Sequence, residues 1–168
     1  MRRPSSNALL IAAAMVAASG MALAKSSDRN QTMNIEADTT TYNANSDSTP
    51  TVLTGNVLIT QGTLKINAGR ADVFQSGGDI RRTILTGSPV RMSQLMDDGT
   101  PLNITASKVD YDMKTEIVTL TGSVVVTQPR GNLRGERVVY NMRNGQVQSG
   151  GQGNGRVRMT IQPKTGSN

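Results

Sequence analysis

Two nearly identical nine-residue segments constrain the fold of this chain more than any other feature of its sequence. LTGNVLITQ at 53–61 returns as LTGSVVVTQ at 120–128, 67 positions further along, and a looser copy, LTGSPVRMSQ, begins at Leu85. A repeat at a fixed spacing is typical of folds in which each copy is one structural unit stacked on its neighbours. The sequence therefore predicts a stacked, repetitive architecture.

Each copy alternates apolar and polar residues with a period of two. In the first copy Leu53, Val57 and Ile59 fall on one side, and Thr54, Asn56 and Thr60 fall largely on the other. This alternation, with its Val, Ile and Thr content, indicates half-buried β-strands. Turn-forming sequences separate the runs, at 61–62, 76–79, 97–99, 129–131 and 144–145. No segment after residue 24 has helical periodicity with caps, so the domain is predicted to be all-β.

The glycine of each LTG phrase lies in the middle of a predicted strand. Glycine at such a position usually marks a bulge, a bend or a close approach of two backbones. We therefore expect Gly55, Gly87 and Gly122 to be corners, at which a strand turns towards the next face of the structure.

The first 24 residues predict a secretory signal peptide. Arg2 and Arg3 precede an apolar run that ends in Ala-Leu-Ala, with cleavage expected after Ala24. The alternative is an uncleaved membrane anchor, but the run is short and rich in Ala, Ser and Gly. The chain divides into the signal peptide (1–24), a mature N-terminal segment (25–32), one β-domain (33–162) and a flexible tail (163–168). The expected location is the periplasm, where disulfides are permitted, yet the chain has no cysteine.

Basic residues are concentrated in the C-terminal part of the chain. From residue 130 onward Glu136 is the only acidic residue, against Arg130, Arg134, Arg137, Arg143, Arg156, Arg158 and Lys164. Two interpretations stay open: a basic surface for phosphates or an acidic partner, and an ordinary solvated β-surface. Nucleic acid is not expected as a partner, because the chain has no recognition motif and only four aromatic residues.

The composition argues against catalysis. The chain has no histidine, which excludes Ser-His-Asp triads and histidine metal sites. Asp97 and Asp98 could form a carboxylate pair for glycoside hydrolysis, but the Gly99 that follows favours a hairpin turn. The methionines are too widely spaced for a thioether copper site. They are expected to lie in the hydrophobic core or to line an apolar hollow inside the domain. No catalytic residue, metal site or cofactor is predicted.

Several segments resemble the OstA/LptA family, the periplasmic component of lipopolysaccharide transport. The segments are NIEA at 34–37 followed by Tyr42, LTGNV and TQG within 53–62, and LKINA at 64–68. The resemblance extends over residues 33–161. It implies a long β-jelly-roll of stacked antiparallel strands with an apolar groove along its axis. In this family the groove holds the acyl chains of lipopolysaccharide (lipid A), and the protein bridges the inner and outer membranes.

The resemblance places groove-lining positions at Met33 and Ile35 and at Val90 and Met92. Strand alternation adds the other apolar positions of the same parity. The complete predicted lining is Met33, Ile35, Val57, Ile59, Leu64, Ile66, Val90, Met92, Leu102, Ile104, Val124 and Val126. The alternative to a lipid carrier is a structural β-repeat module that links envelope proteins edge to edge and carries nothing.

Two segments are expected to form the free edges of the sheet. One spans 33–37 (Met33, Asn34, Ile35, Glu36 and Ala37), and the other spans 156–161 and includes Val157, Arg158, Met159, Thr160 and Ile161. Unpaired edge strands invite pairing with another chain. The resemblance implies head-to-tail self-association, an anchored inner-membrane partner at the N-terminal edge and the outer-membrane lipopolysaccharide-assembly protein at the C-terminal edge.

Overall fold

The computed structural model describes residues 26–43, 49–144, 146–150 and 155–163. The predicted signal peptide and most of the predicted tail lie outside these ranges. A short 3-10 helix, η1 (Ser26–Asn30), precedes the strands. The strands are β1 (Met33–Glu36), β2 (Thr39–Thr41), β3 (Thr51–Gln61), β4 (Leu64–Ser76), β5 (Asp79–Leu95), β6 (Pro101–Asp112), β7 (Ile117–Gln128), β8 (Gly131–Asn141), β9 (Gln146–Ser149) and β10 (Arg158–Ile161).

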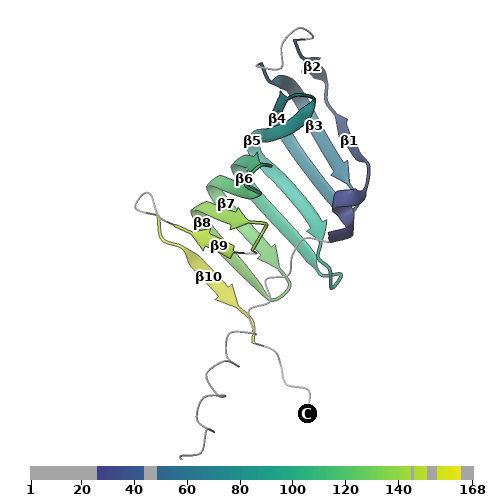
Figure 1. Cartoon of the computed structure of the whole chain (residues 1–168). Helices are drawn as coiled ribbons and strands as arrows, with labels where there is room; N and C mark the ends of the chain where they lie inside the picture. Colours follow the sequence, from purple (N-terminus) through teal and green to yellow (C-terminus); the bar gives the residue numbers. More distant parts are fainter. Residues whose placement is uncertain (1–25, 44–48, 145, 151–154, 164–168) are drawn as a thin grey trace, which may run out of the picture.

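In the described part of the chain all ten strands belong to one sheet, in the order β1-β3-β4-β5-β6-β7-β8-β10. The strand β2 pairs with β3 alongside β1, and β9 pairs with β8 alongside β10. Every pair is antiparallel. Figure 1 shows the strands following one another along the molecule in chain order, with β1 and β2 at one end and β9 and β10 at the other. The all-β prediction is confirmed.

The predicted corners are β-bulges. The pairing register shifts between Thr54 and Val57, between Thr86 and Val90, and between Thr121 and Val124, so that each shift contains one LTG glycine. Gly55 and Gly122 have φ of 76° and 81°, a left-handed conformation that glycine adopts without a steric cost. Each strand continues past its bulge, so the corners lie inside the strands.

The strands opposite the bulges also change face, because each has two consecutive exposed residues where alternation would bury one. Gly69 and Arg70 are such a pair on β4, and Ser107 and Lys108 on β6. The corners therefore line up across the sheet and divide it into two layers.

The two layers enclose one hydrophobic core. The first layer contributes a row of cross-strand partners: Leu53, Ala71, Leu85, Val109, Leu120 and Val138. The second layer contributes Val57, Ile59, Ile66, Ala68, Val90, Ala106 and Val124 to the same cluster. The alternation that predicts each strand thus buries one face of both layers, and the glycine bulges allow the layers to face each other.

Helix η1 was not predicted, and it is held by one buried carboxylate. Asp28 is 5% exposed and accepts hydrogen bonds from the Thr63 hydroxyl and from the Gln94 amide, the latter at 3.1 Å. These partners are on the β3–β4 turn and on β5, so the N-terminal segment is fixed to one end of the sheet. Over the described residues, no helix is both long and apolar enough to cross a membrane.

Candidate functional site

One row of aliphatic side chains crosses the whole second layer. Each of the eight strands in the main path contributes one residue, and each residue is the direct cross-strand partner of the next. The row consists of Ile35, Ile59, Ile66, Met92, Ile104, Val126, Leu133 and Met159. With neighbouring strands about 4.8 Å apart, this aliphatic row is roughly 30 to 35 Å long.

The aliphatic row lies where the apolar interior meets solvent. Nearer the corner, Val57, Val90 and Val124 are at most 1% exposed. Along the row, Ile59 and Ile66 are buried, but the four residues from β5 to β8 are only half-buried. At the two ends of the row, Ile35 is 38% exposed and Met159 is 57% exposed. A continuous apolar strip is therefore partly accessible from outside the protein.

The structure brings the predicted lining residues together on the inward side of this layer. Those at the outer margin are half-buried (Leu64 and Leu102), and those on β1 are exposed (Met33 and Ile35). The three valines next to the corner pack inside the closed core instead of at its margin.

Sequence reasoning missed Leu133, which lies between Val126 and Met159 in the row. Aligning the two repeats, INAGRADVF at 66–74 with LRGERVVY at 133–140, sets Leu133 against Ile66 and could have revealed it. The outward side of the same strands is largely polar. One such row of cross-strand partners has two apolar exceptions, Leu58 and Val125. It consists of Glu36, Leu58, Asn67, Arg91, Thr105, Val125, Arg134 and Arg158.

Acidic side chains near the turns cap backbone groups. Asp98 accepts hydrogen bonds from the Thr100 hydroxyl and backbone N–H, at 2.6 and 2.9 Å, and these bonds lower the pKa of its carboxyl. Asp97 and Asp98 thus belong to a hairpin turn, as the following glycine indicated.

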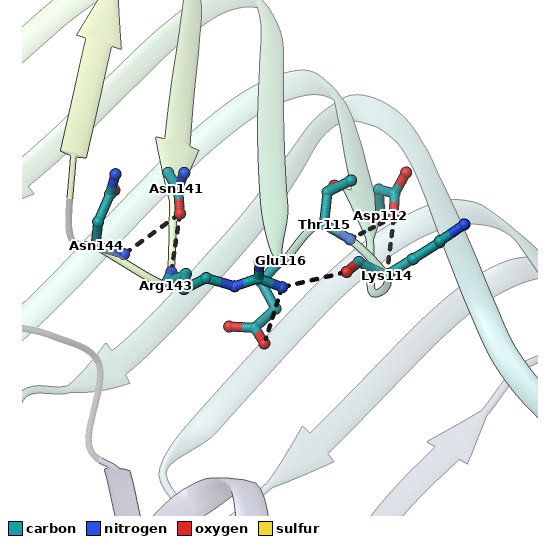
Figure 2. Close-up of polar contacts among 7 residues, drawn as sticks. All are labelled: Asp112, Lys114, Thr115, Glu116, Asn141, Arg143 and Asn144. Carbon is teal, nitrogen blue, oxygen red and sulfur yellow. Dashed lines mark hydrogen bonds and ion pairs between the residues drawn. The ribbon is translucent and has the colours of Figure 1, made fainter.

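Figure 2 shows the same use of polar side chains at two other turns. Asp112 accepts from the backbone N–H groups of Thr115 and Lys114, which lowers the pKa of the Asp112 carboxyl. Asn141 caps the turn that follows β8, and Arg143 connects the two turns through Glu116 at 3.8 Å. These groups stabilise turns, and nothing in their geometry is arranged for catalysis.

On the outer face of the first layer, carboxylates are paired with arginines. Arg82 donates two hydrogen bonds to Asp110, at 2.8 and 2.6 Å, and this hydrogen bonding lowers the pKa of the Asp110 carboxyl. Arg70 makes a similar contact with Asp72. Across the described ranges, no three His, Cys, Asp or Glu residues are placed to share a metal ion.

Both edge strands expose all of their residues. The N-terminal edge β1 carries Glu36, and the C-terminal edge β10 carries Arg158, whose direct cross-strand partner on β8 is Arg134. The predicted edge segments are thus the two terminal strands of the sheet, although β10 begins at Arg158 and β1 ends at Glu36, each inside its predicted segment.

Comparison with known proteins agrees with this geometry. A family model described as LptA/(LptD N-terminal domain) LPS transport protein matches residues 34–146. The chain is 31% identical to the lipopolysaccharide export system protein LptA of Escherichia coli K12, over 92% of this chain and 84% of that protein. It is 32% identical to the LptA of Haemophilus influenzae, over 94% of this chain and 92% of that protein.

A solved structure has a similar fold. The crystal structure of LptH from Pseudomonas aeruginosa, described as the LptA-homologous periplasmic component of the lipopolysaccharide transport device, superposes with a TM-score of 0.70. The match covers 82% of this chain and 99% of that one at 23% sequence identity, and it supports the β-jelly-roll fold.

Proposed function

This chain belongs to the LptA/LptD N-terminal family of lipopolysaccharide transport proteins, and from that premise we propose that it carries lipopolysaccharide along its aliphatic row. The family is one of non-enzymatic transport components, and the periplasm is where such a component acts. We propose that the signal peptide is cleaved after Ala24 and that the mature protein shields the acyl chains of lipid A from water.

The observation that supports this proposal most strongly is the unbroken aliphatic row. Exposing an acyl chain to water costs about 0.8 kcal/mol per CH₂ group, so a chain of about a dozen carbons faces on the order of 10 kcal/mol. A carrier must therefore offer an apolar surface over most of the chain's length. The half-buried residues Met92, Ile104, Val126 and Leu133 give a surface of this kind, and their outward neighbours keep the other side soluble.

The two edge strands suggest how a short protein could connect two membranes. An exposed strand edge can pair with another sheet through its free backbone groups. We propose that β1 pairs with an inner-membrane-anchored transport partner, that β10 pairs with an outer-membrane lipopolysaccharide-assembly protein, and that copies of the chain join head to tail between them. Because the two edges differ, the contact is heterologous and does not close into a ring of two.

Lipid carried by the purified protein tests this function. The full chain is produced in cells that make lipopolysaccharide, and bound lipid is quantified by mass spectrometry after gentle purification. We expect Ile104→Asp to lower bound lipopolysaccharide by about tenfold, because a carboxylate is costly to bury against acyl chains. The adjacent outward substitution Asn103→Asp serves as the control and should leave binding unchanged.

A folded Ile104→Asp variant that retains full lipid binding would contradict the proposed surface. Absence of lipid from the unmodified protein, together with intact edge-to-edge association, would favour the alternative of a linking module that carries nothing. Circular dichroism establishes that each variant is folded.

A further inference from the structure

Each copy of the repeated LTG phrase ends in a glutamine. These margin glutamines are Gln61, Gln94 and Gln128. Each lies two residues after a member of the aliphatic row on the same strand, namely Ile59 on β3, Met92 on β5 and Val126 on β7. Residues two apart on a strand point to the same side of the sheet. The margin glutamines therefore lie on the inward side, one step nearer to the ends of the strands than the aliphatic row.

The margin glutamines lie at regular intervals within an apolar surface. Their strands β3, β5 and β7 alternate in the sheet with β4, β6 and β8, so neighbouring glutamines are roughly 10 Å apart across the strands. Apolar residues are their direct partners: Met33 and Leu64 pair with Gln61, and Leu102 pairs with Gln94. All three glutamines are half-buried. The margin of the apolar strip thus presents single amide groups between aliphatic side chains.

Hydrogen bonds from the amide nitrogens fix the orientation of two of these side chains. Gln94 donates to the Asp28 carboxylate at 3.1 Å. Gln128 donates to the Met96 sulfur at 3.7 Å, and Met96 is buried. A carboxylate and a thioether are acceptors only, so the nitrogen of each amide is the atom that faces them. The carbonyl oxygen of each amide is therefore directed away from these contacts.

The side-chain oxygens of Gln94 and Gln128 are available to a ligand. Among the described residues, no donor forms a hydrogen bond with either oxygen. In the same part of the chain, every buried side-chain nitrogen and oxygen has a partner. These two oxygens are therefore open to solvent. A fixed acceptor beside an apolar surface is suited to recognise a donor group on an otherwise apolar ligand.

On the basis of the proposed carrier function, we propose that Gln94 and Gln128 distinguish lipopolysaccharide from phospholipids by the linkage of the acyl chains. An acylated amino sugar carries an amide N–H, a hydrogen-bond donor, at the point where the apolar chain begins. A glycerophospholipid joins its chains through esters, which have no donor. When the chains lie on the aliphatic row, the linkage lies at the margin of the strip, where the two glutamine oxygens accept the hydrogen bond.

Covering the margin with lipid makes this distinction effective. A ligand that displaces water from an acceptor without supplying a donor leaves the acceptor unpaired, which costs free energy. A site built to form a hydrogen bond therefore rejects an analogue that lacks the donor. An ester would leave the oxygens of Gln94 and Gln128 unpaired, whereas an amide N–H replaces the lost water. We expect each glutamine to contribute a preference of about fivefold to tenfold.

Two synthetic glycolipids that differ only in one linkage test the role of the donor. A diacylated glucosamine, with one chain on its amide nitrogen, is compared with the diacylated glucose that carries the same chain on an ester oxygen. Isothermal titration calorimetry with the purified protein gives the two dissociation constants. The unmodified chain should bind the amide-linked lipid at least about fivefold more tightly. Replacing Gln94 and Gln128 together by methionine, which is similar in length but has no amide, should abolish this preference.

Single variants separate recognition from a structural role. Gln128→Met leaves the contact of Gln94 with Asp28 untouched and should remove part of the preference, whereas Gln128→Glu keeps an acceptor oxygen and should retain it. Gln148→Met, at an exposed position on β9, is the matched control and should bind as the unmodified chain does.

The outcomes distinguish this inference from the carrier function. Equal affinity of the unmodified chain for the two glycolipids, or a preference that persists in the folded double variant, would overturn the role of the glutamines and leave lipid carriage intact. If the unmodified chain binds neither glycolipid and carries no lipopolysaccharide, the carrier function and the inference are both wrong. Circular dichroism establishes that each variant is folded.

Discussion

Met92 on β5 lies directly opposite Ile104 on β6, whereas Arg91, one residue earlier, lies opposite Thr105. The apolar pair faces the interior, and the polar pair faces outward. A single step along a strand therefore moves a side chain from the proposed lipid-binding surface to solvent. Probes placed at adjacent positions of one strand can therefore test which of its two sides contacts lipid.

The first prediction uses that parity. Photo-crosslinking residues that replace Ile35, Ile59, Ile66 or Met92 should capture lipopolysaccharide in living cells, because these positions belong to the aliphatic row. Crosslinkers at Asn34, Lys65 or Arg91 serve as matched controls on the outward side of the same strands. Immunoblots against lipopolysaccharide give the readout. Equal labelling at both parities would rule out a one-sided apolar surface.

The second prediction concerns the bulges. A Cβ atom at Gly122 would lie 2.6 Å from the Ser107 hydroxyl oxygen and 2.7 Å from its Cβ, at a backbone φ of 81°. Gly122→Ala should therefore lower the free energy of unfolding by about 2 kcal/mol or more, through backbone strain and steric overlap. Urea denaturation measures the change.

Gly77→Ala is the matched control for this substitution. Gly77 also has a positive φ, of 62°, but a Cβ there meets nothing within 4 Å. Its variant should show the backbone strain alone, on the order of 1 kcal/mol. Equal losses for the two variants would indicate that Ser107 moves aside and that the packing at the corner is unimportant.

The third prediction concerns pH. Because Arg82 lowers the pKa of Asp110 in the folded protein, folding favours the ionised carboxylate. The resulting stabilisation is complete above the ordinary pKa of an aspartate, about 3.9, and is lost as the pH falls through the lower folded value. Arg82 is half exposed, so the contribution of the pair at neutral pH should be at most about 1 kcal/mol.

The difference in stability between the unmodified chain and Asp110→Asn should accordingly be fully present at pH 7 and shrink progressively as the pH falls below about 3.9, the ordinary pKa of an aspartate. Asp79→Asn is the control, because Asp79 is highly exposed and its contact with Arg81 is long, at 3.8 Å. Denaturation series at several pH values give both comparisons. A difference that persists unchanged at low pH would mean that Asp110 contributes through its neutral hydrogen bonds.

The strands and bulges could be predicted because they leave local signals. Period-two alternation reports which side of a strand is buried, and a glycine in mid-strand reports a departure from regular pairing. For this reason alternation assigns residues such as Ile59, Ile66 and Ile104 to the inward side of their strands, where they lie in the structure. Alternation carries no information on depth, however, so it could not separate Val57 and Val124 in the closed core from Ile104 at the margin.

Other features depend on contacts between distant parts of the chain. Helix η1 has no periodicity of its own, and it is held by Asp28 against Thr63, 35 positions away. The opposition of Arg134 and Arg158 likewise arises only when β10 pairs with β8.

The last prediction concerns removal of the C-terminal edge. Among the described residues, strand β10 pairs only with β8, exposes all four of its residues and contributes none of them to the hydrophobic core. Deletion of residues 156–168 should therefore leave the circular dichroism spectrum and the unfolding transition largely unchanged. The shortened chain should sediment as a monomer, because seven strands remain in the main path and the new edge β8 runs in the same direction as β1. A following copy would then meet this edge in parallel and could not reproduce the antiparallel contact.

Deletion of residues 163–168 alone, which keeps β10, is the control and should associate normally. Long oligomers of the shorter chain, or its unfolding, would show that β10 is not the joining edge.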